Sequence, residues 1–185
     1  LDPKSDAPDA QTPATERFKA DLEANAQLAA THKLSEIDIS AYDGVFYPGG
    51  HGPMWDLAND SDSIALIQDA LAAEKPVAAV CHAPAALKNV KNADGTPLVK
   101  GKTVTGFANV EEDFADNAVW SYGLLPRDKH VMPWRIEDRL KALGANYVQA
   151  GLWRGFAVRD GNLVTGQQNF SGEETARAVI AALGQ

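Results

Sequence analysis

The sequence has little cysteine, little positive charge and no long apolar run. Its single cysteine among 185 residues excludes a disulfide within the chain and fits a reducing compartment, so we expect a cytoplasmic location. The net charge of -8 argues against nucleic acid or an anionic membrane as a partner, because both attract a basic surface. No apolar run approaches the length of a membrane span, and no signal-peptide pattern is visible.

What is present is the composition of an ordinary globular domain. The chain is 45% hydrophobic and 23% charged, and it is long enough to bury a core. We therefore expect one domain over residues 1–185. The chain starts at Leu1 without an initiator methionine, in a stretch rich in proline and aspartate, so we expect residues 1–13 to be a surface loop and the domain to be incomplete on its N-terminal side.

Apolar periodicity predicts that strands and helices alternate along most of the chain. We expect strands at residues 45–47, 77–80, 101–107, 147–148, 156–158 and 163–165. We expect helices at residues 14–30, 62–74 and 133–143, one beginning at 83, one beginning at about 110, and one from 172 onward. This alternation predicts a three-layer α/β sandwich, with a mostly parallel sheet between two layers of helices.

Local patterns refine this outline. Asp160 and Gly161 predict a hairpin between the last two strands, and Ser171 with Glu174 forms the pattern of a capping box before the final helix. Residues 118–130 break the periodicity. We expect an irregular insertion there, whose aromatic side chains pack on another subunit or cover the functional site.

The rest of the chain is organised around residues 77–87, VAAVCHAPAAL. A buried strand is predicted to run into Cys81 and His82, and a helix to follow with Pro84 in its first turn. Such a turn projects one side chain from the edge of the sheet, and a helix N-terminus favours the thiolate form of cysteine. The alternative is that Cys81 is a small buried apolar residue, the commoner role of a lone cysteine. The sharp turn and the adjacent histidine favour a nucleophile.

A glycine-rich loop follows the predicted strand at 45–47. It contains Gly49, Gly50 and His51, and glycine permits positive φ and close approach of the backbone to a ligand oxygen. The alternative is a tight connection that binds nothing. The loop lacks the Lys-Ser/Thr pair of a phosphate-binding loop.

Glu111 and Glu112 also follow a predicted strand. Because ligands of parallel sheets bind beyond the carboxyl ends of the strands, we expect one of these acids to meet His82 near Cys81. The alternatives are that the acids only favour a helix start and that His82 is structural. No paired Cys/His spacing indicates a metal site, and we expect neither a metal nor a cofactor.

Four motifs resemble those of the ThiJ/PfpI family, within the class I glutamine-amidotransferase-like superfamily. They are residues 47–57 (YPGGHGPMWDL), 79–87 (AVCHAPAAL), 101–112 (GKTVTGFANVEE) and 160–167 (DGNLVTGQ). The branch that they resemble most is that of the glutathione-independent glyoxalases, also called glyoxalase III or D-lactate dehydratase. The resemblance covers nearly the whole chain apart from residues 113–130. It implies a flavodoxin-like fold that lacks its first strand and helix in this chain.

The resemblance also implies a set of catalytic residues. Cys81 matches the nucleophile, His82 its neighbouring histidine, and Glu112 the acid that orients the histidine, with Glu111 as the near alternative. The family further has an acid/base glutamate on its first helix, a region that this chain starts after. The resemblance therefore leaves open a separate N-terminal segment of the same protein as a partner.

Four further residues are implied to bind the substrate. Gly50 and Ala83 match the backbone N–H donors of the oxyanion site, although relatives often have glycine where this chain has Ala83. Gly49 and His51 belong to the same loop, and His51 either lines the pocket or caps the loop.

The activity implied by the resemblance is conversion of methylglyoxal, a small 2-oxoaldehyde, to D-lactate without glutathione, by a protein that is expected to be a homodimer. Chemically this requires a soft nucleophile, a base and oxyanion donors. The contrasting functions are a holding chaperone or a sensor in which Cys81 is oxidised to the sulfinate. A cysteine peptidase or amidase would use the same nucleophile with a larger groove.

Overall fold

The structure is a computed structural model that describes residues 7–8 and 11–184. The chain divides into two compact units, residues 1–37 and residues 38–185. In the described part, no helix is both long enough and apolar enough to cross a bilayer.

The first unit contains two helices, α1 (Pro13–Ala20) and α2 (Leu22–Ala29), and the 3-10 turn η3 (Leu34–Glu36). The prediction of one helix over residues 14–30 is wrong, because Asp21 is extended and its side chain accepts the N–H of Ala24 to cap α2. The side-chain oxygen of Thr12 caps α1 in the same way. The loop predicted for residues 1–13 lies mostly outside the described residues, and its last residue begins α1.

The main sheet of the second unit has four strands. Two parallel pairings, β1 with β2 and β2 with β6, are followed by an antiparallel pairing of β6 with β5. The strands are β1 (Val45–Tyr47), β2 (Val77–Val80), β5 (Ala157–Asp160) and β6 (Leu163–Gly166). A separate parallel pair consists of β3 (Thr103–Val104) and β4 (Asn146–Tyr147). This confirms the mostly parallel sheet and the hairpin at Asp160–Gly161.

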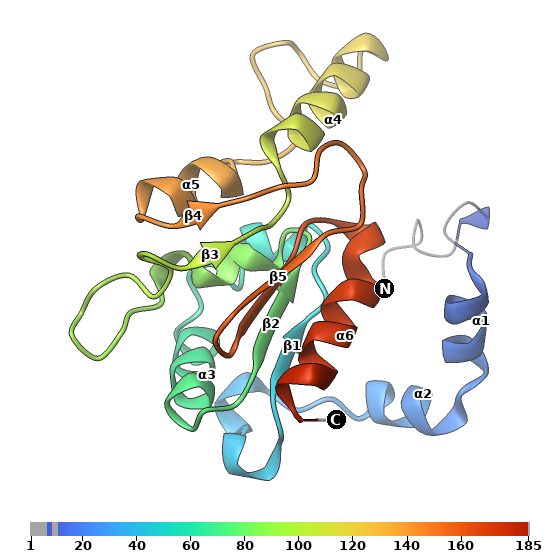
Figure 1. Ribbon diagram of the computed structural model, residues 1–185. Coiled ribbons are helices and arrows are strands. Elements are labelled where there is room, and N and C mark those ends of the chain that lie inside the picture. Colours follow the sequence, from blue (N-terminus) through green and yellow to red (C-terminus); the bar gives the residue numbers. More distant parts are fainter. Residues whose placement is uncertain (1–6, 9–10, 185) are drawn as a thin grey trace. The chain divides into compact units, whose positions relative to one another are not determined.

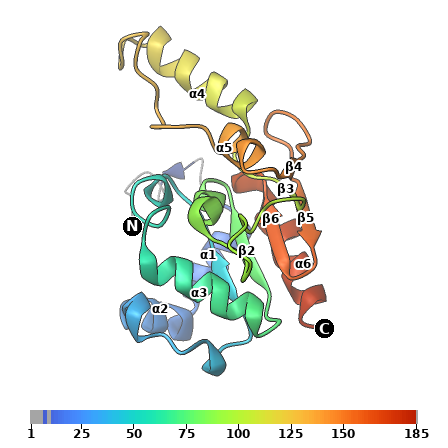
Figure 2. The same ribbon diagram turned by 90° about the vertical axis from the view of Figure 1, so that its left-hand side faces the viewer.

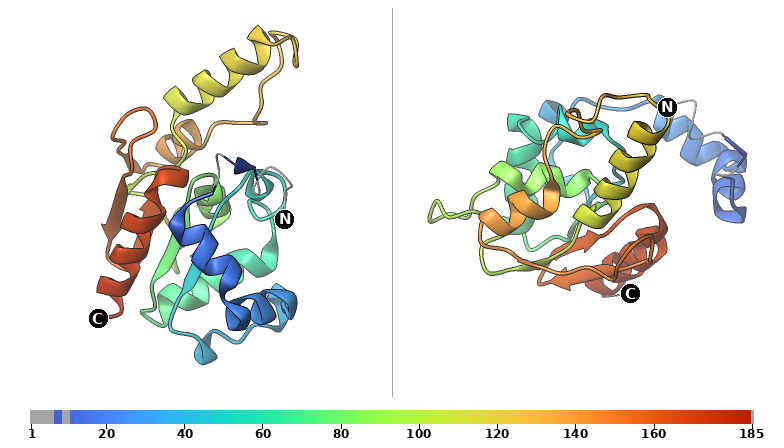
Figure 3. Two further views of the ribbon diagram at one scale, coloured as in Figure 1. Left: turned by 90° about the vertical axis from the view of Figure 1, so that its right-hand side faces the viewer. Right: turned by 90° about the horizontal axis from the view of Figure 1, so that it is seen from above.

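Helices cover both faces of this sheet, as the three-layer prediction requires. Figures 1 and 2 show α3 (Ser61–Ala72) and α6 (Gly172–Ala182) on opposite sides of β2. The other helices of the unit are α4 (Asn109–Ser121), α5 (Ile136–Ala142) and the 3-10 segments η4 (Ile39–Ala41), η5 (Gly52–Met54), η6 (Ala83–Asn89) and η7 (Asn169–Ser171). Figure 3 shows α4 extending away from the sheet.

The core is centred on β2, whose four residues are all buried. A strand with parallel neighbours on both sides is covered on both faces, which explains its uninterrupted apolar sequence. The same core contains Ile67 of α3, Leu87 of η6, and Ile136 and Leu140 of α5, each at most 1% exposed. The end of β2, where Cys81 follows, therefore adjoins the buried core.

Three local predictions are wrong. The helix α4 continues through Ser121, so the irregular stretch covers residues 122–135 rather than 118–130. The helix predicted from residue 133 begins at Ile136. Ser171 does not cap α6 with its side chain, because its hydroxyl accepts the N–H groups of Phe156 and Gln168 and so fixes the end of β6 to the start of β5.

We predict that Gly166→Ala destabilises the protein. A Cβ there would overlap Oγ1 of Thr175 and lie 2.7 Å from Cγ2 of Val80. Neither neighbour yields easily, because Thr175 is fully buried and donates to the carbonyl of Ser171. Overpacking of this kind costs about 1–3 kcal/mol of unfolding free energy. Urea unfolding measures it.

The matched control is Gly172→Ala at the start of α6, where an added Cβ meets nothing within 4 Å. Because alanine is the better helix former, this variant is expected to be as stable as the wild type or slightly more so. Equal stability of the two variants would contradict the close approach of α6 to the sheet.

Candidate active site

Cys81 lies in a strained turn between β2 and η6. Its φ is 66°, in the left-handed region that non-glycine residues adopt at a cost of about 1–3 kcal/mol. The turn is held from two sides: the N–H of Cys81 donates to the carbonyl of Gly166 at 3.0 Å, and its own carbonyl accepts the N–H of Phe107 at 2.9 Å. The side chain remains partly exposed. The elbow predicted from the sequence is therefore present, and Cys81 is partly buried against the core.

The segment after the elbow differs from the prediction. It is the seven-residue 3-10 helix η6 rather than an α-helix. A short 3-10 segment has poorer hydrogen-bond geometry than an α-helix. The dipole of an α-helix is thus not the main electrostatic influence on the sulfur of Cys81. A charged group that stabilises this sulfur must instead be a side chain.

That side chain is His82. Its Nδ1 lies 3.5 Å from Sγ of Cys81, and its Nε2 lies 3.0 Å from Oε1 of Glu112. His82 and Glu112 are only 1% and 2% exposed. Burial alone would lower the pKa of His82, but the hydrogen bonds to Cys81 and Glu112 outweigh it and raise the pKa to about 9. This raised pKa favours the imidazolium, which can donate from both ring nitrogens, to Sγ of Cys81 and to Oε1 of Glu112.

Aromatic rings fix the plane of this imidazole. Phe107 stacks on His82 with ring centroids 4.1 Å apart, and His51 meets it edge-on at 5.0 Å. Trp153 in turn packs edge-on against Phe107 at 5.9 Å. Of Phe107, His51 and Trp153, the sequence predicted only His51 as part of the site. Phe107 lies at the end of the strand predicted at 101–107, next to the expected site, and this position was the available signal for it.

The two neighbouring acids of α4 have different environments. Glu112 faces His82, whereas Glu111 accepts the N–H of Trp153 at 3.2 Å and the side-chain amide of Gln167 at 3.0 Å. Its other oxygen accepts the N–H of Ala108 at the start of the helix. Burial raises the pKa of Glu111, and these three donors partly offset that rise. Of the two acids, Glu112 is the partner of His82.

Gln167 extends this network to residues 148–156, a connection between β4 and β5. Its Oε1 accepts the N–H of Ala150 at 2.9 Å, and its Nε2 donates to the carbonyl of Gly151 at 2.9 Å as well as to Glu111. The side chain is fully buried. Gln167 and Glu111 together link α4, the end of β6 and this connection by hydrogen bonds, next to the candidate catalytic residues. Gln167 ends the 160–167 motif, so its position was visible in the sequence although its role was not.

The glycine-rich loop lies against the elbow. A Cβ on Gly49, whose φ is 99°, would lie 2.6 Å from the carbonyl oxygen of Val80 and 2.9 Å from Cβ of Cys81, so only glycine fits. Gly50 has a φ of 80° and faces open space. No described residue accepts a backbone hydrogen bond from the N–H of Gly50, which is exposed. Ala83, the other donor that the resemblance implies, is fully buried, so its N–H does not face solvent.

Among residues 7–8 and 11–184, no three His, Cys, Asp or Glu side chains are grouped so that they could hold a metal ion. The polar groups around Cys81 are arranged instead as one chain of contacts from thiol to imidazole to carboxylate. Such a chain can hold a thiolate next to an imidazolium, and the adjacent N–H groups can bind a developing negative charge.

Comparison with known proteins agrees with this geometry. The model of the DJ-1/PfpI family matches residues 16–122. Glyoxalase 3 of Candida albicans is 35% identical over 162 residues, covering 86% of this chain and 66% of the relative. The glutathione-independent glyoxalase HSP31 of Saccharomyces cerevisiae is 32% identical over 165 residues, covering 88% and 67%.

Comparison with solved structures also finds a glyoxalase. The crystal structure of glyoxalase III from Candida albicans matches with a TM-score of 0.82 and 32% identity, over 98% of this chain and 75% of that one. This chain thus spans about two thirds of the length of the curated relatives that it matches.

We predict that Glu112→Gln lowers the pKa of His82 from about 9 toward the value of about 6.5 of an unperturbed histidine, because the carboxylate that stabilises the imidazolium is lost. The titration of the His82 ring protons by NMR measures the change. The control is Glu111→Gln, which leaves the Glu112 contact in place and should move the midpoint much less. A larger shift in Glu111→Gln than in Glu112→Gln would refute the assignment.

A second prediction concerns the connection at 148–156. Gln167→Met keeps the volume of the side chain but removes the acceptor of the Ala150 N–H. It also removes the amide that donates to Glu111 and to the carbonyl of Gly151, so three hydrogen bonds are lost. At about 1 kcal/mol for the bond to Ala150 alone, amide exchange at Ala150 should speed up by at least about fivefold. Exchange at Val80 in the sheet should be unchanged. Unaltered exchange at Ala150 would show that Gln167 does not anchor this connection.

Proposed function

The chain belongs to the DJ-1/PfpI family, and from this premise we propose that it converts methylglyoxal to D-lactate by a cysteine-dependent reaction that needs no glutathione. The observation that carries the proposal is the contact chain from Cys81 through His82 to Glu112. Support also comes from relatives at 32–35% identity that bear glyoxalase names.

In the first step the Cys81 thiolate attacks the aldehyde carbon of methylglyoxal, and a C–S bond forms as the carbonyl π electrons move to oxygen. In this proposal the N–H of Gly50 stabilises the resulting oxyanion, with the N–H of Ala83 as the second donor expected from the family resemblance. The imidazolium of His82 then protonates it, giving a hemithioacetal. Once the sulfur is bonded to carbon it carries no charge, so one of the two contacts that raise the pKa of His82 is lost and the proton leaves readily.

The neutral His82 can next act as a base. It removes the hydrogen of the former aldehyde carbon to form an enediol and returns the proton to the adjacent carbon, which yields a lactoyl thioester on Cys81. Water cleaves the thioester to lactate and the free thiol. Methylglyoxal plus one water therefore equals lactic acid, with no external oxidant or reductant. Glu112 stabilises His82 during the steps in which the ring is charged.

Two further proposals accompany this one, a cytoplasmic location and a homodimer. A reactive thiolate requires a reducing compartment, which is consistent with the cytoplasm. A homodimer would cover exposed apolar side chains of the stretch after α4, where Tyr122 is 80% and Leu124 is 70% exposed. The same exposed side chains are the observation that favours the second candidate function, a holding chaperone.

The test is turnover of methylglyoxal by the purified protein, with lactate as the measured product. We predict that Cys81→Ser loses activity by at least about 10³-fold, because a hydroxyl supplies no comparable nucleophile at neutral pH. Glu112→Gln should lose about 10- to 100-fold, with the alkaline limb of its pH profile moved below that of the wild type, because His82 then loses its proton at lower pH.

The control is suppression of aggregation of an unfolded client by the same proteins. Lactate formation that persists in Cys81→Ser would refute the mechanism. No lactate from either protein, together with equal suppression of aggregation by both, would replace the enzyme by the chaperone.

A further inference from the structure

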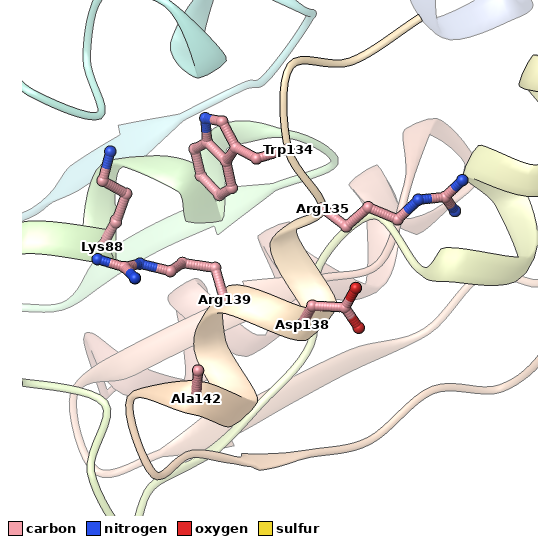
Figure 4. A pocket seen from close by; sticks show the side chains of 6 residues that line it. All are labelled: Lys88, Trp134, Arg135, Asp138, Arg139 and Ala142. Atoms are coloured by element: carbon pink, nitrogen blue, oxygen red, sulfur yellow. The ribbon is translucent and has the colours of Figure 1, made fainter. Parts of the chain in front are cut away.

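A hollow of about 520 Å³ lies between η6 and α5, and none of its residues belongs to the candidate catalytic set. It is lined by Lys88, Trp134, Arg135, Asp138, Arg139 and Ala142. Its volume falls within the range of about 300–1,000 Å³ that is usual for sites of small molecules. Figure 4 shows these side chains around the hollow.

Two of the charged side chains that line the hollow, Arg135 and Asp138, are paired with residues outside it. Arg135 points toward α4, where its guanidinium contacts Asp113 and Asp116 at 2.9 Å each. Asp138 accepts the side-chain amide of Asn109 at 2.7 Å, and in Figure 4 its carboxylate lies on the side away from Lys88. Neither therefore neutralises the charge on the opposite side of the hollow.

That opposite side carries the ends of Lys88 and Arg139 (Figure 4). Within the described part of the chain, the ammonium of Lys88 contacts only neutral groups, Oδ1 of Asn59 at 3.1 Å and the ring of Trp134 at 5.1 Å from its centroid. Among the described residues, none supplies a hydrogen bond or a carboxylate to the guanidinium of Arg139. Lys88 and Arg139 therefore place two cations on one hollow without an acidic partner, which is an unusual arrangement in a chain with a net charge of -8. An anion bound there would stabilise it.

The rest of the lining is flat and apolar. The indole of Trp134 and the methyl of Ala142 form it, together with the aliphatic stems of the two basic side chains. The hollow is too large for an oxyanion alone. An Arg guanidinium binds planar or tetrahedral oxyanions through two parallel hydrogen bonds, while an indole packs against a ring.

We propose that this hollow binds a small aromatic anion, with a phosphate or carboxylate group on Arg139 and Lys88 and its ring against Trp134. The site is distinct from Cys81 and does not depend on the proposed glyoxalase reaction. Lys88 and the elbow are the two ends of one segment, since η6 begins two residues after Cys81.

Titration of the protein with phenyl phosphate, followed by the indole N–H signal of Trp134 in the NMR spectrum, tests the proposal. We expect saturable shifts of this signal, weaker binding of inorganic phosphate, and no binding of phenol. Benzoate in a parallel titration distinguishes a carboxylate from a phosphate as the preferred group. Absence of saturable shifts with both phenyl phosphate and benzoate would overturn the proposal.

Substitution of the two basic residues tests whether phenyl phosphate binds in this hollow. Arg139→Gln and Lys88→Gln should each weaken phenyl phosphate binding about tenfold, as expected for loss of one charge-assisted contact. The matched control is Arg177→Gln on α6, an exposed arginine paired with Glu173, which should bind as the wild type does. Equal weakening in all three variants would reduce the effect to nonspecific charge and refute the site. Lactate production in Lys88→Gln and Arg139→Gln should remain at the wild-type level, which separates this result from the fate of the proposed function.

Discussion

The structure depends on one buried charged contact, the imidazole of His82 held between a sulfur and a carboxylate. A buried charge is costly unless both sides of it are paired, and removal of one partner leaves the other uncompensated. Here both ring nitrogens are occupied, at 3.5 Å by Cys81 and at 3.0 Å by Glu112. The raised pKa of His82 is the measure of that pairing, because its contacts overcome the opposing effect of burial.

Much of the second unit serves to keep this contact in place. The elbow is fixed by backbone bonds from Gly166 of β6 and from Phe107, segments about 60 residues apart in the sequence. The same Phe107 stacks on the imidazole, so one residue fixes both the backbone and the ring. Behind it, Glu111 and Gln167 secure the start of α4, and the start of α4 places Glu112.

The sequence was sufficient for the strands of the main sheet, the elbow and the convergence of the segments that follow the strands, because these follow from apolar runs and from the geometry of parallel sheets. The strand expected at residues 101–107 is shorter, Thr103–Val104, and pairs with β4 outside the main sheet. It could not separate Glu111 from Glu112 by residue pattern alone, since neighbours on a helix point about 100° apart and the rotation of α4 is set by tertiary contacts. Ser171 shows the same limit, because its hydroxyl accepts the N–H of Gln168, three residues before it, and that of Phe156 at the start of β5 instead of capping α6. The break at Asp21 was missed because aspartate is compatible with a helix and only its capping of α2 reveals the interruption.

The most direct test of the account is the rate of Cys81 alkylation by iodoacetamide at pH 7, compared between the wild type and Glu112→Gln. If the contact chain from Glu112 through His82 supports the nucleophile, the wild type reacts faster than the variant at this pH. Equal rates in the two proteins would contradict the account.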